Sequence, residues 1–212
     1  MYDPYLYDDC DVLKNKLGLK NGDLLDKAEV EFSCNAIHDL LKNPIPGDYD
    51  FKHLCMFHAR IFGDVYEWAG QPRSVLIEKQ EAVLGYTSIE YAMPQTIEAE
   101  AVDVMQNMNA ICWEAFSLNE QAELLSTGLA DLWKIHPFRE GNTRTTVTFI
   151  CQFAESKGLP LDRELFEENA AYLRSALVAA TAIFKDGDFR KFDYLIRIVQ
   201  DSLERGIKKM LN

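Results

Sequence analysis

The chain has 212 residues, and 48% of them are apolar, which is enough for one well-buried domain and too many for a disordered chain. Its net charge of −12 argues against general nucleic-acid binding, because an acidic surface repels phosphate backbones. No apolar run approaches the length of a membrane span, and the N-terminus lacks the basic and apolar stretches of a secretion signal, so we expect a cytoplasmic protein without a membrane segment.

Helical patterns dominate the first half of the chain. Apolar residues recur every three to four positions over residues 23–41, which predicts an amphipathic helix. Asp50 can cap a second helix that Gly63 ends. Ser117 and Glu120 form a capping-box pattern at the start of a third helix, whose far end carries a histidine.

The second half predicts further helices and contains two segments with strand character. One helix is expected to end at residues 157–158, Asp162 can cap the next, and Asp188 can cap the last. Residues 71–86 are rich in branched side chains followed by glycine, which is typical of a strand or small hairpin. Residues 145–150 favour strand by propensity alone, and their assignment to a helix depends on the resemblance given below. The predicted fold class is therefore all-α with one small β-hairpin.

Residues 136–144, His-Pro-Phe-Arg-Glu-Gly-Asn-Thr-Arg, combine the groups of a phosphoryl-type transfer site. His136 can take a proton from a hydroxyl near neutral pH, and Glu140 is an oxygen ligand of the kind magnesium prefers. A helix begins just after this turn, so its free N–H groups can hold a phosphate that Gly141 allows to come close. Arg144 adds a cation with fork geometry in the first turn.

This stretch resembles the signature of the Fic family, His-Pro-Phe-x-(Asp/Glu)-Gly-Asn-Gly-Arg-x-x-Arg, at seven fixed positions. Residues 51–73 also resemble the family's helix and turn that lead into its flap, and residues 5–18 its N-terminal approach. The resemblance covers residues 1 to about 160 and implies a mainly helical Fic domain with a small β-hairpin flap. The expected organisation is a single domain over 1–212, with N-terminal helices over 1–70, the flap over about 71–86, the core motif over 136–147 and closing helices over 160–212.

The resemblance implies a protein adenylyltransferase, in a family that includes bacterial toxins. Such an enzyme transfers AMP from ATP, as co-substrate, to a Ser, Thr or Tyr hydroxyl of a target protein and releases pyrophosphate. His136 would be the catalytic base, and Glu140 would hold Mg²⁺ against the α- and β-phosphates. The implied nucleotide-binding residues are Lys79, Gln80, Gly141, Asn142, Thr143 and Arg144. The target would dock on the flap by strand addition, and Phe138 would anchor the motif in the core.

The sequence departs from the family pattern in two places. Thr143 stands where the family usually has Gly, and its Cβ is harmless only if the backbone there is helical. Val147 replaces the second Arg, which removes a charge-assisted phosphate contact worth roughly 1.5–3 kcal/mol. No clear inhibitory Ser/Thr-x-x-x-Glu motif is present, although Glu29 and Glu31 are imperfect candidates. We therefore expect a protein that lacks the family's usual self-inhibition, or one that a separate inhibitory partner or a homo-oligomer restrains.

Other interpretations remain open at this stage. The chain could be a Fic-fold transferase that uses another donor, such as a UMP or phosphate donor, or a catalytically weak nucleotide-binding regulatory module. Self-modification is also open, because a flap that accepts extended chains can accept its own. We predict structural roles for His53 and His58 and core positions for Trp68 and Trp133.

Overall fold

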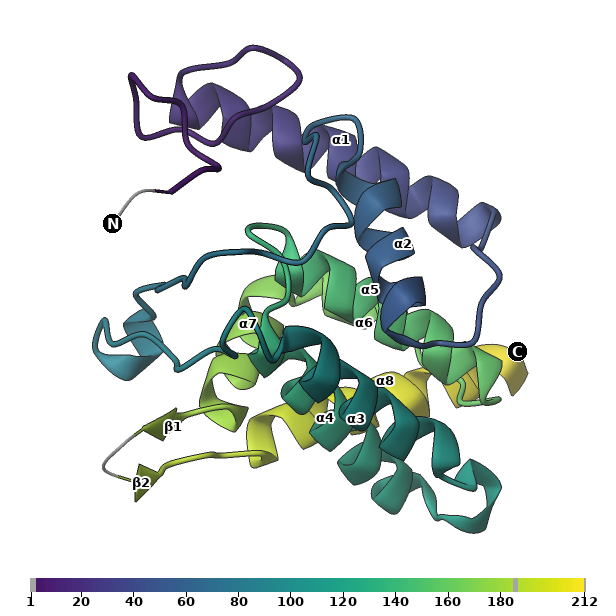
Figure 1. The fold of residues 1–212 in the computed structure, drawn as a ribbon. Coiled ribbons are helices and arrows are strands. Elements are labelled where there is room, and N and C mark those ends of the chain that lie inside the picture. The colour runs from purple at the N-terminus through teal and green to yellow at the C-terminus, as the bar shows by residue number, and fades with distance from the viewer. Residues whose placement is uncertain (1–2, 185–186, 212) are drawn as a thin grey trace.

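The computed structural model describes residues 3–184 and 187–211. Helices make up most of this part, joined by turns and by one long non-helical segment before α3 (Figure 1). The elements are α1 Gly22–Lys42, α2 Phe51–Phe62, η1 Ala82–Leu84, α3 Ile97–Ala110, η2 Trp113–Ala115, α4 Leu118–Ile135, α5 Asn142–Ser156, α6 Arg163–Glu168, α7 Ala170–Ala180, β1 Ile183–Phe184, β2 Gly187–Asp188 and α8 Asp193–Leu211.

Capping side chains start the helices where the sequence predicts them. Asp50 accepts a hydrogen bond from the backbone N–H of His53, and Asp162 accepts one from Glu164. Ser117 and Glu120 form a complete capping box at α4. Mainly helical architecture is thereby confirmed, and residues 145–150 are helical within α5 despite their strand propensity. Thr145, Thr146 and Thr148 are buried there, so tertiary packing decides the outcome.

Two local expectations need correction, and one helix was missed. Residues 71–86 form no strand, and a single bridge pairs Glu81 with Thr87 around η1. The only ladder in the described residues is β1–β2. The flap forms no hairpin, because an isolated hairpin is only marginally stable and the Lys79 N–H of the flap bonds to the Ser88 side chain instead. Asp188 lies in β2 and bonds to Arg190, five residues before α8 begins. Helix α3 was not predicted, and Thr96 at its start makes no side-chain cap.

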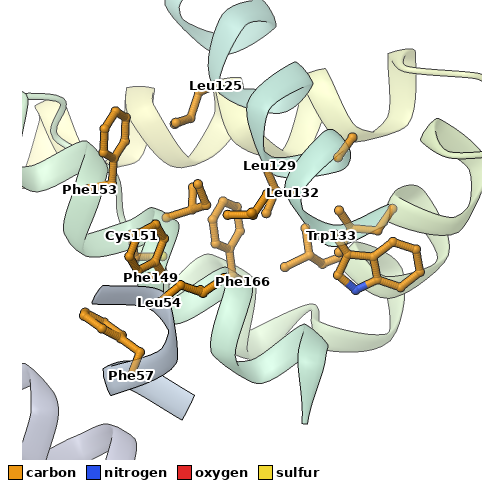
Figure 2. Packing of buried hydrophobic residues seen from close by; sticks show 14 of the residues in the cluster. Leu54, Phe57, Leu125, Leu129, Leu132, Trp133, Phe149, Cys151, Phe153 and Phe166 are labelled. Carbon is orange, nitrogen blue, oxygen red and sulfur yellow. The ribbon is translucent and has the colours of Figure 1, made fainter. Parts of the chain in front are cut away.

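The core is built around α4. Side chains of α4 meet aromatic and aliphatic side chains of α2, α5 and α6 in one continuous cluster (Figure 2). In the same arrangement α8 packs along α4, and α1 packs on α2. The residues labelled in Figure 2 are Leu54, Phe57, Leu125, Leu129, Leu132, Trp133, Phe149, Cys151, Phe153 and Phe166.

This packing fixes the end of α4 against the start of α5. Both helices are buried along most of their length, so the turn between them cannot move independently of the core. The segment containing η1 and the β1–β2 pair project on the same side of the molecule (Figure 1). No helix in the described part of the chain combines the length and apolar character that crossing a membrane requires.

Candidate active site

The α4–α5 turn contains two residues in the left-handed backbone region. His136 ends α4 with φ 51°, and Gly141 precedes α5 with φ 79°. A Cβ at Gly141 would lie 2.3 Å from the ring of Phe62, so both the backbone angle and the space require glycine. The Asn142 side chain closes the turn, because its amide accepts from the Phe138 N–H at 2.8 Å and donates to the Phe138 carbonyl at 2.7 Å.

His136 is 1% exposed and its ring is held from two sides. The ring of Tyr91 stacks on it with centroids 4.1 Å apart. Nδ1 lies 3.0 Å from the Trp133 carbonyl, and since a carbonyl only accepts, Nδ1 carries the proton and Nε2 has a free lone pair. Burial, followed by the charge of Lys79, holds the pKa of His136 well below its usual range. The ring is therefore neutral in the free protein, with Nε2 unprotonated.

Glu140 forms an ion pair with Lys79 from the flap. The Lys79 ammonium donates to both carboxylate oxygens, at 3.3 and 3.0 Å, and the Gly141 N–H donates to one of them at 2.9 Å. Burial raises the pKa of Glu140, but Lys79 and the Gly141 N–H outweigh it and bring the pKa to about 2. Glu140 is thus an ionised carboxylate that already faces a cation.

The N-terminus of α5 is open to an anion. No side chain caps it, so the N–H groups of its first turn have no helical partner. Thr143 lies in this turn with ordinary helical dihedrals, so the Cβ that it adds in place of the family's Gly causes no backbone strain. Its hydroxyl accepts from the indole N–H of Trp133 at 2.9 Å and from Arg174 of α7 at 3.3 Å. Arg174 also pairs with the buried carboxylate of Glu81 at 2.7 Å.

Arg144 is engaged by α1. Its guanidinium donates to the Ser33 hydroxyl at 2.8 Å and forms an ion pair with the buried Glu29. It also lies over the ring of Phe62, 4.8 Å from the centroid. Glu29, which the sequence flagged as an imperfect inhibitory candidate, thus contacts Arg144. Val147 lines an apolar cavity of about 160 Å³ beside it.

The flap presents an unpaired edge beside these groups. Exposure alternates along residues 74–80, as in a strand with one face turned inward, yet no strand pairs with this segment in the described residues. Lys79 points inward to Glu140, whereas Gln80 is exposed. Of the predicted nucleotide-binding residues, Gln80 is therefore the one that the structure does not bring to the α4–α5 turn.

A cleft of about 490 Å³ separates η1 from α7 and the start of α8. Its lining includes Ser175, the residue after Arg174, and Arg174 contacts Thr143 in the first turn of α5. Its walls are almost entirely apolar and aromatic, and they include Val83, Leu84, Tyr172, Ala176, Phe189 and Tyr194. A flat aromatic ring fits such walls, which is typical of a site for a nucleobase.

The other predicted roles are borne out by contacts. His53 and His58 each bond backbone groups on both ring nitrogens, and Phe138 and Trp133 are fully buried. Trp68 is partly buried and packs against the core cluster. No local pattern marked Glu81, Tyr91 or Arg174 as members of the site, since each reaches it only through the fold.

A sequence profile of the Fic/DOC family matches residues 48–154. The chain is 34% identical over 166 residues to protein adenylyltransferase VbhT of Bartonella schoenbuchensis, covering 78% of this chain but only 33% of that protein. It is 32% identical over 169 residues to the probable protein adenylyltransferase y4lH of Sinorhizobium fredii, covering 82% of that protein. The fold is similar to that of the BepC protein of Bartonella tribocorum with bound AMPPNP, with a TM-score of 0.76, 21% identity and coverage of 93% and 95% of the two chains.

Proposed function

Because the chain belongs to the Fic/DOC family, we propose that it is a protein adenylyltransferase that transfers AMP from ATP to a hydroxyl side chain of a target protein. Both curated relatives described above carry that activity in their names, one of them as probable. The observation that carries the proposal is a neutral His136 with a free Nε2 next to an uncapped helix N-terminus.

His136 performs the proton transfer in this reaction. Its Nε2 takes the proton of the target hydroxyl while the hydroxyl oxygen attacks the α-phosphorus of ATP. A bond forms between that oxygen and the α-phosphorus, the bond to the β-phosphate oxygen breaks, and pyrophosphate leaves. The Trp133 carbonyl keeps the other ring nitrogen protonated, which leaves Nε2 as the nitrogen that accepts the proton. The ring becomes cationic near phosphate, which offsets the burial that lowers its pKa.

The donor binds across three elements. The α-phosphate lies on the first-turn N–H groups of α5, with Thr143 and Arg174 beside it. The base enters the aromatic cleft between η1 and α7, where Tyr172 and Tyr194 offer ring faces. BepC, which has the same fold, was crystallised with the ATP analogue AMPPNP, in keeping with a nucleotide as donor.

Magnesium fits this site through one carboxylate. Glu140 is ionised and already paired with the Lys79 ammonium, and no group of three or more acidic, His or Cys ligands exists among the described residues. That inventory suits Mg²⁺, which takes one or two carboxylates and completes its shell with phosphates and water, and does not suit a fully protein-bound metal. Glu140 is the residue that would hold the ion, and the ion would supply neutralisation of phosphate charge.

The target chain binds as an added strand on the flap. Exposure alternates along residues 76–80, and no strand of the described structure pairs with them. Main-chain bonds to this edge would hold a target segment next to His136 with little dependence on its sequence. The chain's own exposed hydroxyls can enter the same way, so self-modification belongs to the proposal.

The decisive experiment is incubation with α-labelled or γ-labelled ATP and Mg²⁺, with a bacterial lysate as acceptor and the protein itself as a second acceptor. We expect label on protein from α-labelled ATP alone, and its loss in His136→Ala. His38→Ala, at an exposed position of α1, is the matched histidine control and keeps full labelling. Label from the γ-position, or α-label that persists in His136→Ala, would overturn the proposal.

A further inference from the structure

Arg73 is a buried cation without an acidic partner. Only 2% of it is exposed, and it forms no ion pair with any residue of the described chain. Burial lowers the pKa of Arg73, yet a guanidinium stays charged in proteins. Burying an unpaired charge is costly, so its surroundings must supply compensating dipoles. They do so through backbone carbonyls from two parts of the chain that are distant in sequence.

The first set of carbonyls belongs to the end of α4 and the turn after it. The Arg73 Nε–H donates to the His136 carbonyl at 2.8 Å, and Nη2 donates to Ile135 at 3.4 Å. The Arg73 backbone N–H donates to Pro137 at 2.8 Å. The last carbonyls of a helix have no helical partner and carry the negative end of its dipole, so the guanidinium caps α4. It thereby fixes the backbone of His136 in the left-handed conformation that directs its ring into the site.

The second set flanks residues 76–91, which comprise most of the flap and the segment that follows it. Nη1 donates to the Val75 carbonyl at 2.8 Å, and Nη2 also donates to the Ala92 carbonyl. Residues 76–91 lie between these two anchors and include Lys79, which pairs with the metal-binding carboxylate, and Tyr91, which stacks on the catalytic ring. One guanidinium therefore joins both ends of this segment to the helix end that carries the base.

We propose that Arg73 is a positioning residue that couples the flap to the catalytic histidine, so that target docking and proton transfer share one rigid frame. It does not touch the reacting atoms. Lysine cannot replace it, because one ammonium group cannot bond carbonyls on opposite sides at the same time, as the forked guanidinium does. The activity part of the inference rests on the proposed AMP transfer, whereas the coupling itself is a property of the free protein.

The test compares Arg73→Lys and Arg73→Met with wild type by amide hydrogen exchange without nucleotide. Loss of hydrogen bonds to a charged donor predicts exchange at least about tenfold faster across residues 76–91 and at His136, relative to the amides of α8 in the same sample. The control is Arg60→Met, which removes the ion pair between Arg60 and Asp39 and leaves both the flap and α8 unchanged. Equal acceleration in the flap and in α8 would mean that Arg73 only stabilises the fold, and would overturn the coupling.

Steady-state kinetics supply the second readout. With coupling, kcat for AMP transfer falls at least about tenfold in both variants, and KM for ATP also rises, because residues 76–91 include Lys79 and η1 at the proposed nucleotide site. Unchanged kcat in Arg73→Lys would refute the positioning role. If wild type transfers no AMP at all, the proposed function fails, and the exchange experiment still decides whether Arg73 couples the flap to His136.

Discussion

His58 offers a quantitative test of the buried network under the site. The Gly70 N–H donates to its Nδ1 at 2.8 Å, so Nε2 carries the proton and donates to the Glu140 carbonyl at 3.0 Å. Its ring stacks on Phe138 with centroids 3.8 Å apart. Both ring nitrogens are thus committed in the neutral form. Burial is the main cause that lowers the pKa of His58 to about 3.

This neutrality makes stability depend on pH in a defined direction. The pKa of His58 is lower in the folded than in the unfolded state, so the unfolded chain binds more protons below pH 6.5. The stabilisation is complete above pH 6.5 and is lost as the pH falls from 6.5 toward 3. Between pH 7.5 and 5.5, linkage gives a loss of about 1.4 kcal/mol for this histidine. His136 acts in the same direction, so a variant must separate the two.

The variant is His58→Phe, which keeps a stacked ring but cannot titrate. It leaves the Gly70 N–H and the Glu140 carbonyl unpaired, which costs roughly 1–3 kcal/mol each at pH 7.5. Urea unfolding followed by tryptophan fluorescence at constant ionic strength gives the stability gap to wild type at both pH values. We expect the gap to narrow by about 1.4 kcal/mol at pH 5.5. Leu54→Ala, also buried in α2, is the control whose gap stays constant. If the difference in unfolding free energy between wild type and His58→Phe is the same at both pH values, His58 is not held neutral by its two hydrogen bonds.

Three further substitutions have defined outcomes. Gly141→Ala forces a Cβ into a buried ring at positive φ and is expected to lose roughly 2–5 kcal/mol in urea unfolding, whereas Gly85→Ala, with positive φ but open space, loses only about 1 kcal/mol. Lys79→Met removes the cation beside Glu140 and raises the pKa of that carboxyl, which carbon NMR titration detects; Lys79→Arg keeps the pKa low. Ser117→Ala removes the α4 cap and costs about 1 kcal/mol, while Ser117→Asp restores most of the loss.

The sequence predicts local structure well where a side chain bonds its own backbone neighbours. The caps at Asp50, Ser117 and Asp162 are such cases, and all three start helices as expected. Helix α3 was missed because Thr96 provides no such signal. The flap was predicted as a hairpin from its branched residues, but strand propensity describes a side chain that packs on a neighbouring strand, and none is present here.

The candidate site likewise has one part that local sequence predicts and another part that distant contacts create. Its predicted base and predicted anion-binding turn follow from one contiguous motif, and the resemblance implies a role for seven of the residues in 136–144. The partners that control those residues come from far along the chain: Glu140 pairs across 61 positions, and Arg144 across 115. Arg73 is the sharpest case, since arginine is seldom buried and no pattern around it predicts that it caps a helix 62 positions away.

These long-range contacts explain how a chain of net charge −12 can gather positive charge in one place, as the proposed ATP site requires. Three cations surround the N-terminus of α5, and a glutamate from another element holds each one: the pairs are Lys79–Glu140, Arg144–Glu29 and Arg174–Glu81. A phosphate entering this ring meets oriented N–H groups and cations that are already positioned, so it loses little to ordering them. The phosphate must also compete with the three carboxylates for these cations. A divalent cation bound to Glu140 would remove one of the three competitors. A phosphate therefore binds cations that are paired with glutamates in the free protein. These ion pairs form only when the chain folds, so the preference of the site for one anion over another depends on the fold.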